Sequence, residues 1–558
     1  MSLRTALLMI AVFFIAANRG AFAQKLETGP QVLTIFSNVD DSEQPYGLYL
    51  PKHFNPAKKY PLVIMLHGAY SNHRIALRRV FGKSNANGET DAEATRYFPK
   101  WKDINYIVAT PLARGTMGYQ GIAEKDVYDV LADVEKRFPI DRNRVYLTGL
   151  SMGGGGTLWL GLTRPDIWAA IAPVCPAPPS ETKSFAPNAL NYPVSFHQGG
   201  ADPVVNPQGT RDWVKLMKDL GIKVEYTEYP GVQHNCWEEA YKDEAIFKWF
   251  SKFRRNPFPN RVRFVTDRYE YDSAYWLAID ELTPGTLASV DAKFTGVNKI
   301  DIQESNLGVF TLNLKGHPEF RPSRPVSITV NGKTMAATTK NAITLVLRDS
   351  TWAVREYNPQ ANAKRPGAEG PIWRAFAKGH VYIYGTAGNP SQEALEDRRS
   401  IAEDVSKWQA PLPLLFFPRT ISDKEVRPSD FGYSNLILFG TSETNSVIKE
   451  LNDKLPIHFK GADSSYGLVY IYPDSAHYVV VCSGKPWWPS VKSQSSHGGF
   501  HSFLPVAMLT RFGDYVMYKD NLSNIIAAGR FDNQWRLAPA DSAKMVSTGC
   551  VTIDNVSN

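Results

Sequence analysis

The chain has 558 residues, of which 43% are hydrophobic and 21% charged, and these fractions are ordinary for a globular protein. This length exceeds the roughly 100 to 200 residues of one typical domain, so two or three domains are expected. The formal net charge is +7, but Lys and Arg are scattered and no dense basic block with interleaved aromatic residues occurs, which argues against a nucleic-acid partner.

The first 23 residues have the pattern of a secretory signal peptide. Arg4 supplies a small basic region, residues 7–17 form an apolar core that is short for a bilayer span, and Ala21-Phe22-Ala23 is a small-x-small cleavage site. An uncleaved N-terminal anchor is the alternative. No later stretch approaches about 18 consecutive apolar residues, so we expect a secreted or periplasmic protein with no integral membrane contact.

Residues 24–255 alternate between strand and helix patterns. Strands are expected at 31–36, 46–50, 60–66, 106–110, 145–148, 168–174, 193–197 and 223–229, and helices at 123–138, 209–220 and 238–253. This alternation predicts an α/β domain with a mostly parallel sheet and helices on both faces.

The pattern changes after residue 255. Residues 256–357 contain short strand-like runs separated by turns, including the hairpin signal Asn331-Gly332 between two alternating runs, and predict a small sandwich-like β domain. In residues 358–558 strands and helices alternate again, which predicts a second α/β domain of unknown role.

The pattern Gly149-x-Ser151-x-Gly153 is the strongest chemical signal in the chain. The β-forming run 145–148 precedes it and a Leu- and Trp-rich segment at helical spacing follows it, so a strand, a sharp turn and a helix are expected. Such a turn exposes a serine hydroxyl in strained backbone where a Cβ atom at either glycine would clash. Ser151 is therefore the candidate nucleophile; a chance match or a purely structural tight loop is the alternative.

A serine nucleophile needs a base and a group that orients the base. Asp202 follows the predicted strand 193–197, and His234 follows the strand 223–229. Parallel strands end at the same edge of a sheet, so these side chains should converge on Ser151, with His234 as general base and Asp202 as its partner. An Asp-Pro turn residue and a loop histidine are the structural alternatives.

The negative charge that develops during attack needs two backbone N–H donors. One is expected from Met152, directly after the nucleophile, and the other from Ala69 or Tyr70, in the turn after the strand 60–66. No metal site is expected, since the chain has no Cys-x-x-Cys and no clustered Cys/His pattern.

The four cysteines are an even number in a chain expected to be exported. The natural pairing joins Cys175 to Cys236 and Cys482 to Cys550, although four cysteines allow three connectivities and the sequence does not choose among them. Free buried thiols at Cys175 and Cys236 are the alternative.

Three aromatic residues lie near these motifs. Tyr119, Trp159 and Trp237 are candidates for lining a substrate cleft, because aromatic rings stack on sugar or phenolic rings. Core or rim positions are the alternative for each of them.

Together these motifs resemble the α/β-hydrolase superfamily over about residues 40–255. The narrower resemblance is to secreted esterases and predicted peptidases similar to feruloyl and acetylxylan esterases, polyhydroxyalkanoate depolymerases and prolyl-oligopeptidase-like hydrolases. It is carried by the segments 145–154, Arg164-Pro165-Asp166, 169–173, 199–202 and 234–241. The resemblance implies hydrolysis without a cofactor, through an acyl-enzyme on Ser151.

Three functions remain open at this point. The first is a serine esterase acting on a small-molecule or polymeric ester, of feruloyl, acetylxylan or polyester type. The second is a prolyl-oligopeptidase-type serine peptidase, although the chain lacks the propeller that precedes such a catalytic domain. The third is a non-catalytic binding protein on a hydrolase scaffold. The oligomeric state is not accessible from the sequence.

Overall fold

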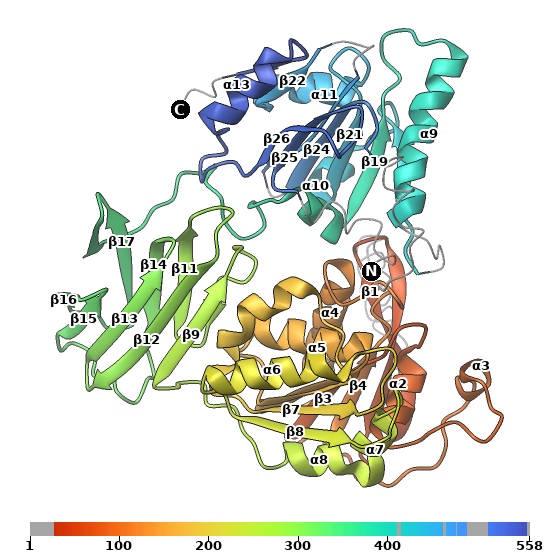
Figure 1. Cartoon of the computed structure of the whole chain (residues 1–558), viewed down its shortest axis with the longest axis vertical. Coiled ribbons are helices and arrows are strands. Elements are labelled where there is room, and N and C mark those ends of the chain that lie inside the picture. The colour runs from red at the N-terminus through yellow and green to blue at the C-terminus, as the bar shows by residue number, and fades with distance from the viewer. Residues whose placement is uncertain (1–26, 410–414, 461–464, 476, 488–511, 555–558) are drawn as a thin grey trace, which may run out of the picture.

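The computed structural model describes residues 27–409, 415–460, 465–475, 477–487 and 512–554. The predicted signal peptide, residues 1–23, lies outside these ranges. Three groups of sheets follow one another along the chain, and Figure 1 shows them as three adjoining bodies. An α/β sheet is followed by a β sandwich and then by a second α/β sheet, which confirms the predicted fold class.

The first body contains an eight-stranded sheet with the order β1-β2-β4-β3-β5-β6-β7-β8. Its strands are β1 (Gly29–Ser37), β2 (Ser42–Leu50), β3 (Tyr60–Leu66), β4 (Ile107–Pro111), β5 (Ile140–Leu150), β6 (Ala170–Val174), β7 (Val194–Gly199) and β8 (Val224–Tyr229). β1, β2 and β4 pair antiparallel in turn, and from β4 to β8 every neighbouring pair is parallel. Loops after β5, β7 and β8 therefore meet at one edge of the sheet.

Helices flank this sheet, except for α3 (Asp91–Ala94), which projects away from it (Figure 1). They are α2 (His73–Val80), α3 (Asp91–Ala94), α4 (Ile122–Arg137), α5 (Met152–Thr163), α6 (Pro207–Asp219), α7 (Trp237–Ala240) and α8 (Ala245–Phe250), with 3-10 segments at Ser180–Asn191 and Lys242–Glu244. The single helix expected at 238–253 is wrong, because Asp243 and Glu244 adopt left-handed backbone at φ 52° and 54°. These two residues separate α7 from α8.

The second body is a sandwich of two five-stranded sheets, with the orders β10-β11-β14-β17-β18 and β16-β15-β13-β12-β9. Its strands are β9 (Arg261–Thr266), β10 (Ser273–Ala274), β11 (Leu277–Leu282), β12 (Ala288–Gly296), β13 (Lys299–Ser305), β14 (Leu307–Asn313), β15 (Val326–Val330), β16 (Lys333–Ala337), β17 (Ala342–Arg348) and β18 (Thr351–Val354). Asn331 and Gly332 join β15 to β16 with φ 45° and 84°, which confirms the predicted hairpin.

The third body has a seven-stranded sheet with the order β20-β19-β21-β24-β23-β25-β26, and a two-stranded sheet β22-β27. Its strands are β19 (His380–Tyr384), β20 (Arg419–Ser422), β21 (Asn435–Phe439), β22 (Ile457–Phe459), β23 (Tyr466–Asp474), β24 (His477–Gly484), β25 (Tyr515–Lys519), β26 (Ile525–Gly529) and β27 (Val551–Ile553). Its helices are α9 (Gln392–Gln409), α10 (Pro428–Tyr433), α11 (Ser446–Leu451) and α13 (Pro539–Ser547), with 3-10 segments at Ile372–Ala377 and Asn452–Lys454.

The three bodies meet around one buried arginine. The guanidinium of Arg268 lies 5.5 Å from the ring centroid of Trp159 in α5, 5.5 Å from that of Tyr271, and 5.7 Å from that of Trp373 in the third body. Arg268 also pairs with its neighbour Asp267. A cation enclosed by aromatic faces from all three bodies indicates that they pack as one unit.

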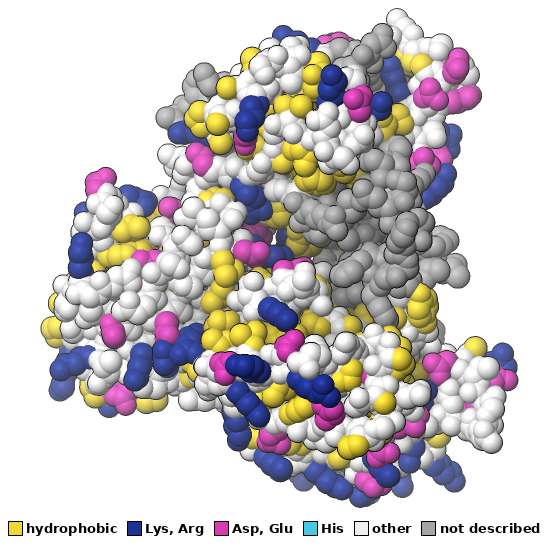
Figure 2. Space-filling view, in the orientation of Figure 1, with side chains coloured by type: hydrophobic (Ala, Val, Ile, Leu, Met, Phe, Trp, Pro, Cys, Tyr) yellow, Lys and Arg dark blue, Asp and Glu magenta, His cyan; other side chains and the backbone are white. Residues whose placement is uncertain are grey.

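The surface mixes charges of both signs. Figure 2 shows Lys and Arg side chains interspersed with Asp and Glu over the face that it displays. Among the described helices, none combines the length and the apolar character that a membrane crossing needs.

Candidate active site

Ser151 lies in the sharp turn between β5 and α5. Its backbone has φ 56° and ψ −118°, a conformation that side chains with a Cβ atom rarely adopt, and its N–H donates to the carbonyl of Val174 at 2.9 Å. α5 begins at the next residue, Met152, so the free N–H groups of its first turn lie beside the serine. The expected order of strand, turn and helix is confirmed.

The two glycines of the motif allow this turn. A Cβ atom on Gly149 would lie 2.3 Å from the carbonyl oxygen of Gly153, and one on Gly153 would lie 2.3 Å from the carbonyl oxygen of Leu66. Both distances are far below van der Waals contact with backbone atoms that have little room to move. The predicted clash at both positions is confirmed.

The structure brings the three predicted catalytic residues together at the carboxyl ends of β5, β7 and β8. His234 Nε2 lies 3.0 Å from Ser151 Oγ, and His234 Nδ1 lies 2.8 Å from Asp202 Oδ2. Because a carboxylate only accepts, Nδ1–H donates to Asp202, and Nε2 is free to accept from the serine hydroxyl. The imidazole is thereby set in the tautomer that a general base requires.

Burial differs among the three side chains. The carboxylate of Asp202 has 0% of its side-chain surface exposed, whereas His234 has 21% exposed. Ser151 is 4% exposed. The carboxylate thus lies behind the histidine, and the histidine faces solvent, as proton exchange with a substrate requires.

The predicted oxyanion donors need one correction. The N–H of Tyr70 donates to Thr116 Oγ1 at 2.9 Å, so it is already committed within the protein. Ala69 and Met152 therefore remain the candidate donor pair. The loop lies close to the nucleophile, since a Cβ atom on Gly68 would lie 3.5 Å from the Cβ of Ser151.

Two of the three predicted cleft aromatics belong to the core, so that prediction is wrong for them. Tyr119 is 3% exposed and donates its hydroxyl to the carbonyl of His67 at 2.9 Å, and Trp159 is 1% exposed and donates Nε1 to Glu124 at 2.9 Å. Trp237 does lie at the site, with its ring centroid 5.5 Å from that of His234 in an edge-to-face arrangement.

The predicted disulfides are also corrected, because all four cysteines are free thiols in the structure. Cys175 and Cys236 are fully buried neighbours behind the site. Burial raises the pKa of the Cys175 thiol well above its usual value, and a hydrogen bond with Cys236 adds to this shift. Cys482 lies in β24, and Cys550 precedes β27 in the separate two-stranded sheet.

One cluster of metal-ligating atoms occurs among the described residues. Cys175, Asp202 and His234 each present one such atom within 4.8 Å of the others. The 2.8 Å contact between His234 Nδ1 and Asp202 Oδ2 is already bridged by a proton, so two of the three potential ligands are engaged with each other.

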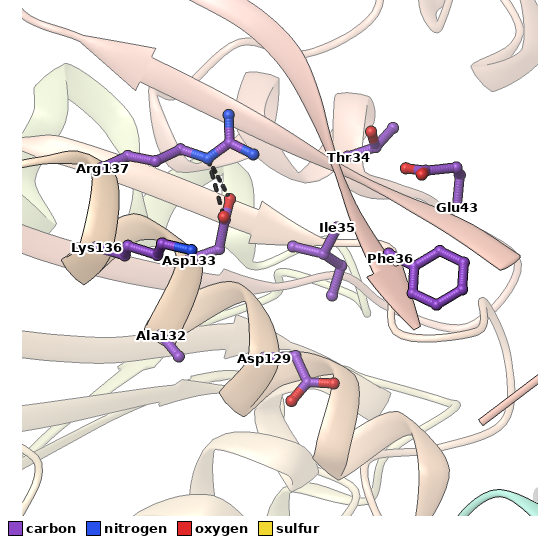
Figure 3. A pocket seen from close by; sticks show the side chains of 9 residues that line it. All are labelled: Thr34, Ile35, Phe36, Glu43, Asp129, Ala132, Asp133, Lys136 and Arg137. Atoms are coloured by element: carbon purple, nitrogen blue, oxygen red, sulfur yellow. Dashed lines mark hydrogen bonds and ion pairs between the residues drawn. The ribbon is translucent and has the colours of Figure 1, made fainter. Parts of the chain in front are cut away.

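A surface groove of about 510 Å³ lies elsewhere, between β1 and α4 (Figure 3). Its lining residues are Thr34, Ile35, Phe36, Glu43, Asp129, Ala132, Asp133, Lys136 and Arg137. None of the three predicted catalytic residues borders it, and an ion pair between Asp133 and Arg137 lies along its helical wall.

Sequence reasoning missed three polar residues around the site. Thr116 holds the Tyr70 loop, Gln198 donates to Asp202, and Thr210 donates to Gln198. Gln198 directly follows the predicted strand 193–197 and precedes Asp202 by four residues, which is the only local signal that pointed to it. The other two act across loops or helices that no short motif connects.

Comparison with known proteins adds to this geometry. Residues 37–205 match the protein family described as "Putative esterase". This part of the chain has the α/β-hydrolase fold. A probable carboxylesterase from Oryza sativa subsp. japonica is 28% identical to this chain over 156 residues, which are 27% of this chain and 58% of that protein.

Two further matches each cover part of both proteins. A poly(3-hydroxybutyrate) depolymerase from Ralstonia pickettii is 46% identical over 146 residues, 23% of this chain and 27% of that protein. A solved structure of a thermostable esterase is 26% identical, covers 40% of this chain and 63% of its own, and has a TM-score of 0.33. All three matches span less than two thirds of the relative's own length.

Proposed function

We propose that this protein is an exported serine hydrolase that cleaves carboxylic esters. The observation that carries the proposal is the continuous series of hydrogen bonds from Ser151 Oγ through His234 to Asp202, at 3.0 and 2.8 Å. A positioned base within hydrogen-bond reach of a hydroxyl is what nucleophilic catalysis by serine requires. Export rests on the signal-peptide pattern of residues 1–23.

In the first half-reaction, Ser151 Oγ attacks the ester carbonyl carbon while His234 Nε2 takes the serine proton. Asp202 accepts from Nδ1–H and stabilises the imidazolium that forms. The carbonyl oxygen becomes an oxyanion, to which the N–H groups of Met152 and Ala69 donate. The intermediate then expels the alcohol, which takes the proton from Nε2, and leaves an acyl group on Ser151.

In the second half-reaction, water replaces the alcohol. His234 Nε2 accepts a proton from the water as it attacks the acyl carbonyl, and then returns a proton to Ser151 Oγ as the acid leaves. Every proton transfer passes through one nitrogen atom, so the cycle needs no group beyond these side chains and the two backbone donors.

The names of the matched relatives favour an ester bond over a peptide bond as the bond that is cleaved. The matched proteins from Oryza sativa subsp. japonica and Ralstonia pickettii are a probable carboxylesterase and a poly(3-hydroxybutyrate) depolymerase. These names support an ester of a small molecule or a polyester. The feruloyl and acetylxylan types rest on the resemblance of the sequence motifs.

The test is a comparison of substrates with the full mature chain from residue 24. p-Nitrophenyl acetate, methyl ferulate and suspended poly(3-hydroxybutyrate) are compared with a prolyl-peptide nitroanilide, beside the Ser151→Ala variant. We expect ester hydrolysis that the substitution reduces by about 10⁴- to 10⁶-fold. Cleavage of the peptide alone would replace the esterase by a prolyl-oligopeptidase-type peptidase. No turnover of any substrate would favour a binding protein on a hydrolase scaffold.

A further inference from the structure

A buried glutamine contacts the carboxylate behind the predicted base. Gln198 is the next-to-last residue of β7 and is 0% exposed. Its Nε2 donates to Asp202 Oδ2 at 3.0 Å, the same oxygen that accepts from His234 Nδ1 at 2.8 Å. The glutamine therefore touches the group that orients the base, but it reaches neither the serine nor the solvent side of the site.

With this contact the carboxylate of Asp202 is fully occupied. Its other oxygen, Oδ1, accepts from the N–H groups of Val204 at 2.8 Å and Val205 at 2.9 Å. Four donors match the roughly four acceptor positions of a carboxylate. In a fully buried group, the loss of one donor leaves an unpaired acceptor and frees the carboxylate to rotate away from the histidine.

The amide of Gln198 has only one favourable orientation. Its Nε2 also donates to the carbonyl of Val205 at 3.1 Å, and its Oε1 accepts from Thr210 Oγ1 at 2.8 Å. A flipped amide would place Oε1 against the Asp202 carboxylate and the Val205 carbonyl, which only accept. Thr210 lies in α6 and is 1% exposed, so it forms a buried anchor on a separate element.

We propose that Gln198 is a positioning residue for the triad and that Thr210 holds it in place. Gln198 fixes the Asp202 carboxylate so that Oδ2 stays aligned with His234 Nδ1, and the opposite nitrogen of the ring stays directed at Ser151. This inference rests on the proposed serine-hydrolase function, and it concerns the alignment of the base rather than the binding of substrate.

The first test replaces Gln198 by Met, which has a similar length but no amide donor. A hydrogen bond to a charged group is lost, so kcat for p-nitrophenyl acetate should fall about 10- to 100-fold. KM should stay unchanged, because the side chain is inaccessible to substrate. The matched control is Ser195→Ala, which removes a buried hydroxyl from the same strand that contacts His197 rather than the triad. It should keep the wild-type kcat.

The second test uses the charge of a near-isostere. In Gln198→Glu, a protonated carboxyl can donate to Asp202 as the amide does, whereas an ionised carboxylate repels it. The ratio of kcat for the Glu variant to kcat for the Met variant should therefore fall as pH rises. A purely structural role for Gln198 gives a ratio that does not depend on pH, and this result would overturn the inference.

The third test removes the anchor. Thr210→Val has the same shape without a hydroxyl and should lower kcat about 3- to 10-fold. Thr210→Ser restores a hydroxyl and should exceed the Val variant. Equal kcat in the Val and Ser variants would show that Thr210 does not hold the amide.

A readout without turnover separates this inference from the proposed function. The His234 Nδ1–H resonance, observed by NMR in ¹⁵N-histidine-labelled full-length protein, should shift in Gln198→Met and stay in place in Ser195→Ala. If the wild type hydrolyses no ester but the resonance still shifts in Gln198→Met, the alignment role stands and the esterase function is removed. An active wild type with unchanged kcat and an unmoved resonance in the Met variant would remove the alignment role alone.

Discussion

Arg114 in the α/β-hydrolase domain donates through Nη1 to the backbone carbonyl of Leu415 at 2.9 Å. The same guanidinium pairs with Asp40 and Asp126, each at 2.6 Å, and its side chain is 0% exposed. Asp40 Oδ2 also accepts from the N–H of Phe417 at 2.9 Å. Arg114 and Asp40 therefore join the third body to the first, and Asp126 holds the guanidinium from within the first body.

Arg114→Met should be strongly destabilising. The substitution leaves the carboxylates of Asp40 and Asp126 buried without their cation, and breaking a buried pair in this way costs about 3–5 kcal/mol. The measurement is the free energy of unfolding in urea. The control is Arg137→Met, whose pair with Asp133 is partly exposed and should cost less than about 1 kcal/mol. Equal effects of the two substitutions would contradict the importance of the buried attachment.

The loop that carries Arg114 also contacts the segment of the predicted oxyanion donors. Thr116 follows Arg114 by two residues and accepts the N–H of Tyr70. In Thr116→Val that N–H loses its acceptor, so the neighbouring Ala69 donor should shift and kcat should fall about 10-fold, less than the 10²- to 10³-fold that loss of a whole donor costs. Thr116→Ser keeps the acceptor and serves as the comparison. Equal kcat in the Val and Ser variants would contradict this role of Thr116.

Buried acids give the stability a pH dependence. Glu124 is 4% exposed and accepts from Trp159 Nε1 at 2.9 Å and from the Tyr271 hydroxyl at 2.8 Å. Burial, together with the charge of Glu270, raises its pKa to about 7. Burial likewise raises the pKa of Glu369, at the same junction of domains, to about 7, although Arg374 opposes the shift.

The sign of the pH effect follows from these raised values. An ordinary Glu pKa in the unfolded chain is near 4.5, so between pH 4.5 and 7 the folded state binds more protons than the unfolded state. The stability from protonated Glu124 is full below pH 4.5 and is lost as pH rises through 7, by on the order of 3 kcal/mol.

Glu124→Gln should therefore flatten the dependence of unfolding free energy on pH between 5 and 8, measured by urea denaturation at each pH. The amide oxygen of the Gln variant can still accept from Trp159 and Tyr271 without a charge to bury. Glu135→Gln, at a surface pair with Arg142, should leave the slope as in wild type. A slope that Glu124→Gln does not change would show that this carboxyl does not titrate between the two states.

The positions of Ser151, Asp202 and His234 could be predicted because each follows a strand in a local pattern. A short apolar run ended by turn residues indicates a strand, and the carboxyl ends of parallel strands meet at one edge. The need for glycine at 149 and 153 could also be predicted, because the sharp turn at Ser151 excludes a Cβ atom at both positions. Short-range sterics and sheet geometry are enough for this part of the site.

The remaining features depend on packing between distant segments. An aromatic residue near a motif gives the same sequence pattern whether its side chain faces a cleft or the core. Tyr119 and Trp159 lie in the core. Gln198 meets Thr210 only because α6 packs beside β7, and Arg268 meets its three aromatic rings only where the domains join. No periodicity or spacing in the sequence encodes such contacts.

The most direct test of the central claim is covalent labelling of the full mature chain with a fluorophosphonate probe, followed by intact mass and peptide mapping. We expect one adduct, on Ser151, because among the residues that the structure describes only this hydroxyl has a histidine nitrogen at 3.0 Å with a carboxylate behind it. Labelling should be absent in Ser151→Ala and slowed by several orders of magnitude in His234→Ala. An adduct on another residue, equal labelling of Ser151→Ala, or no adduct on the wild type would contradict the account.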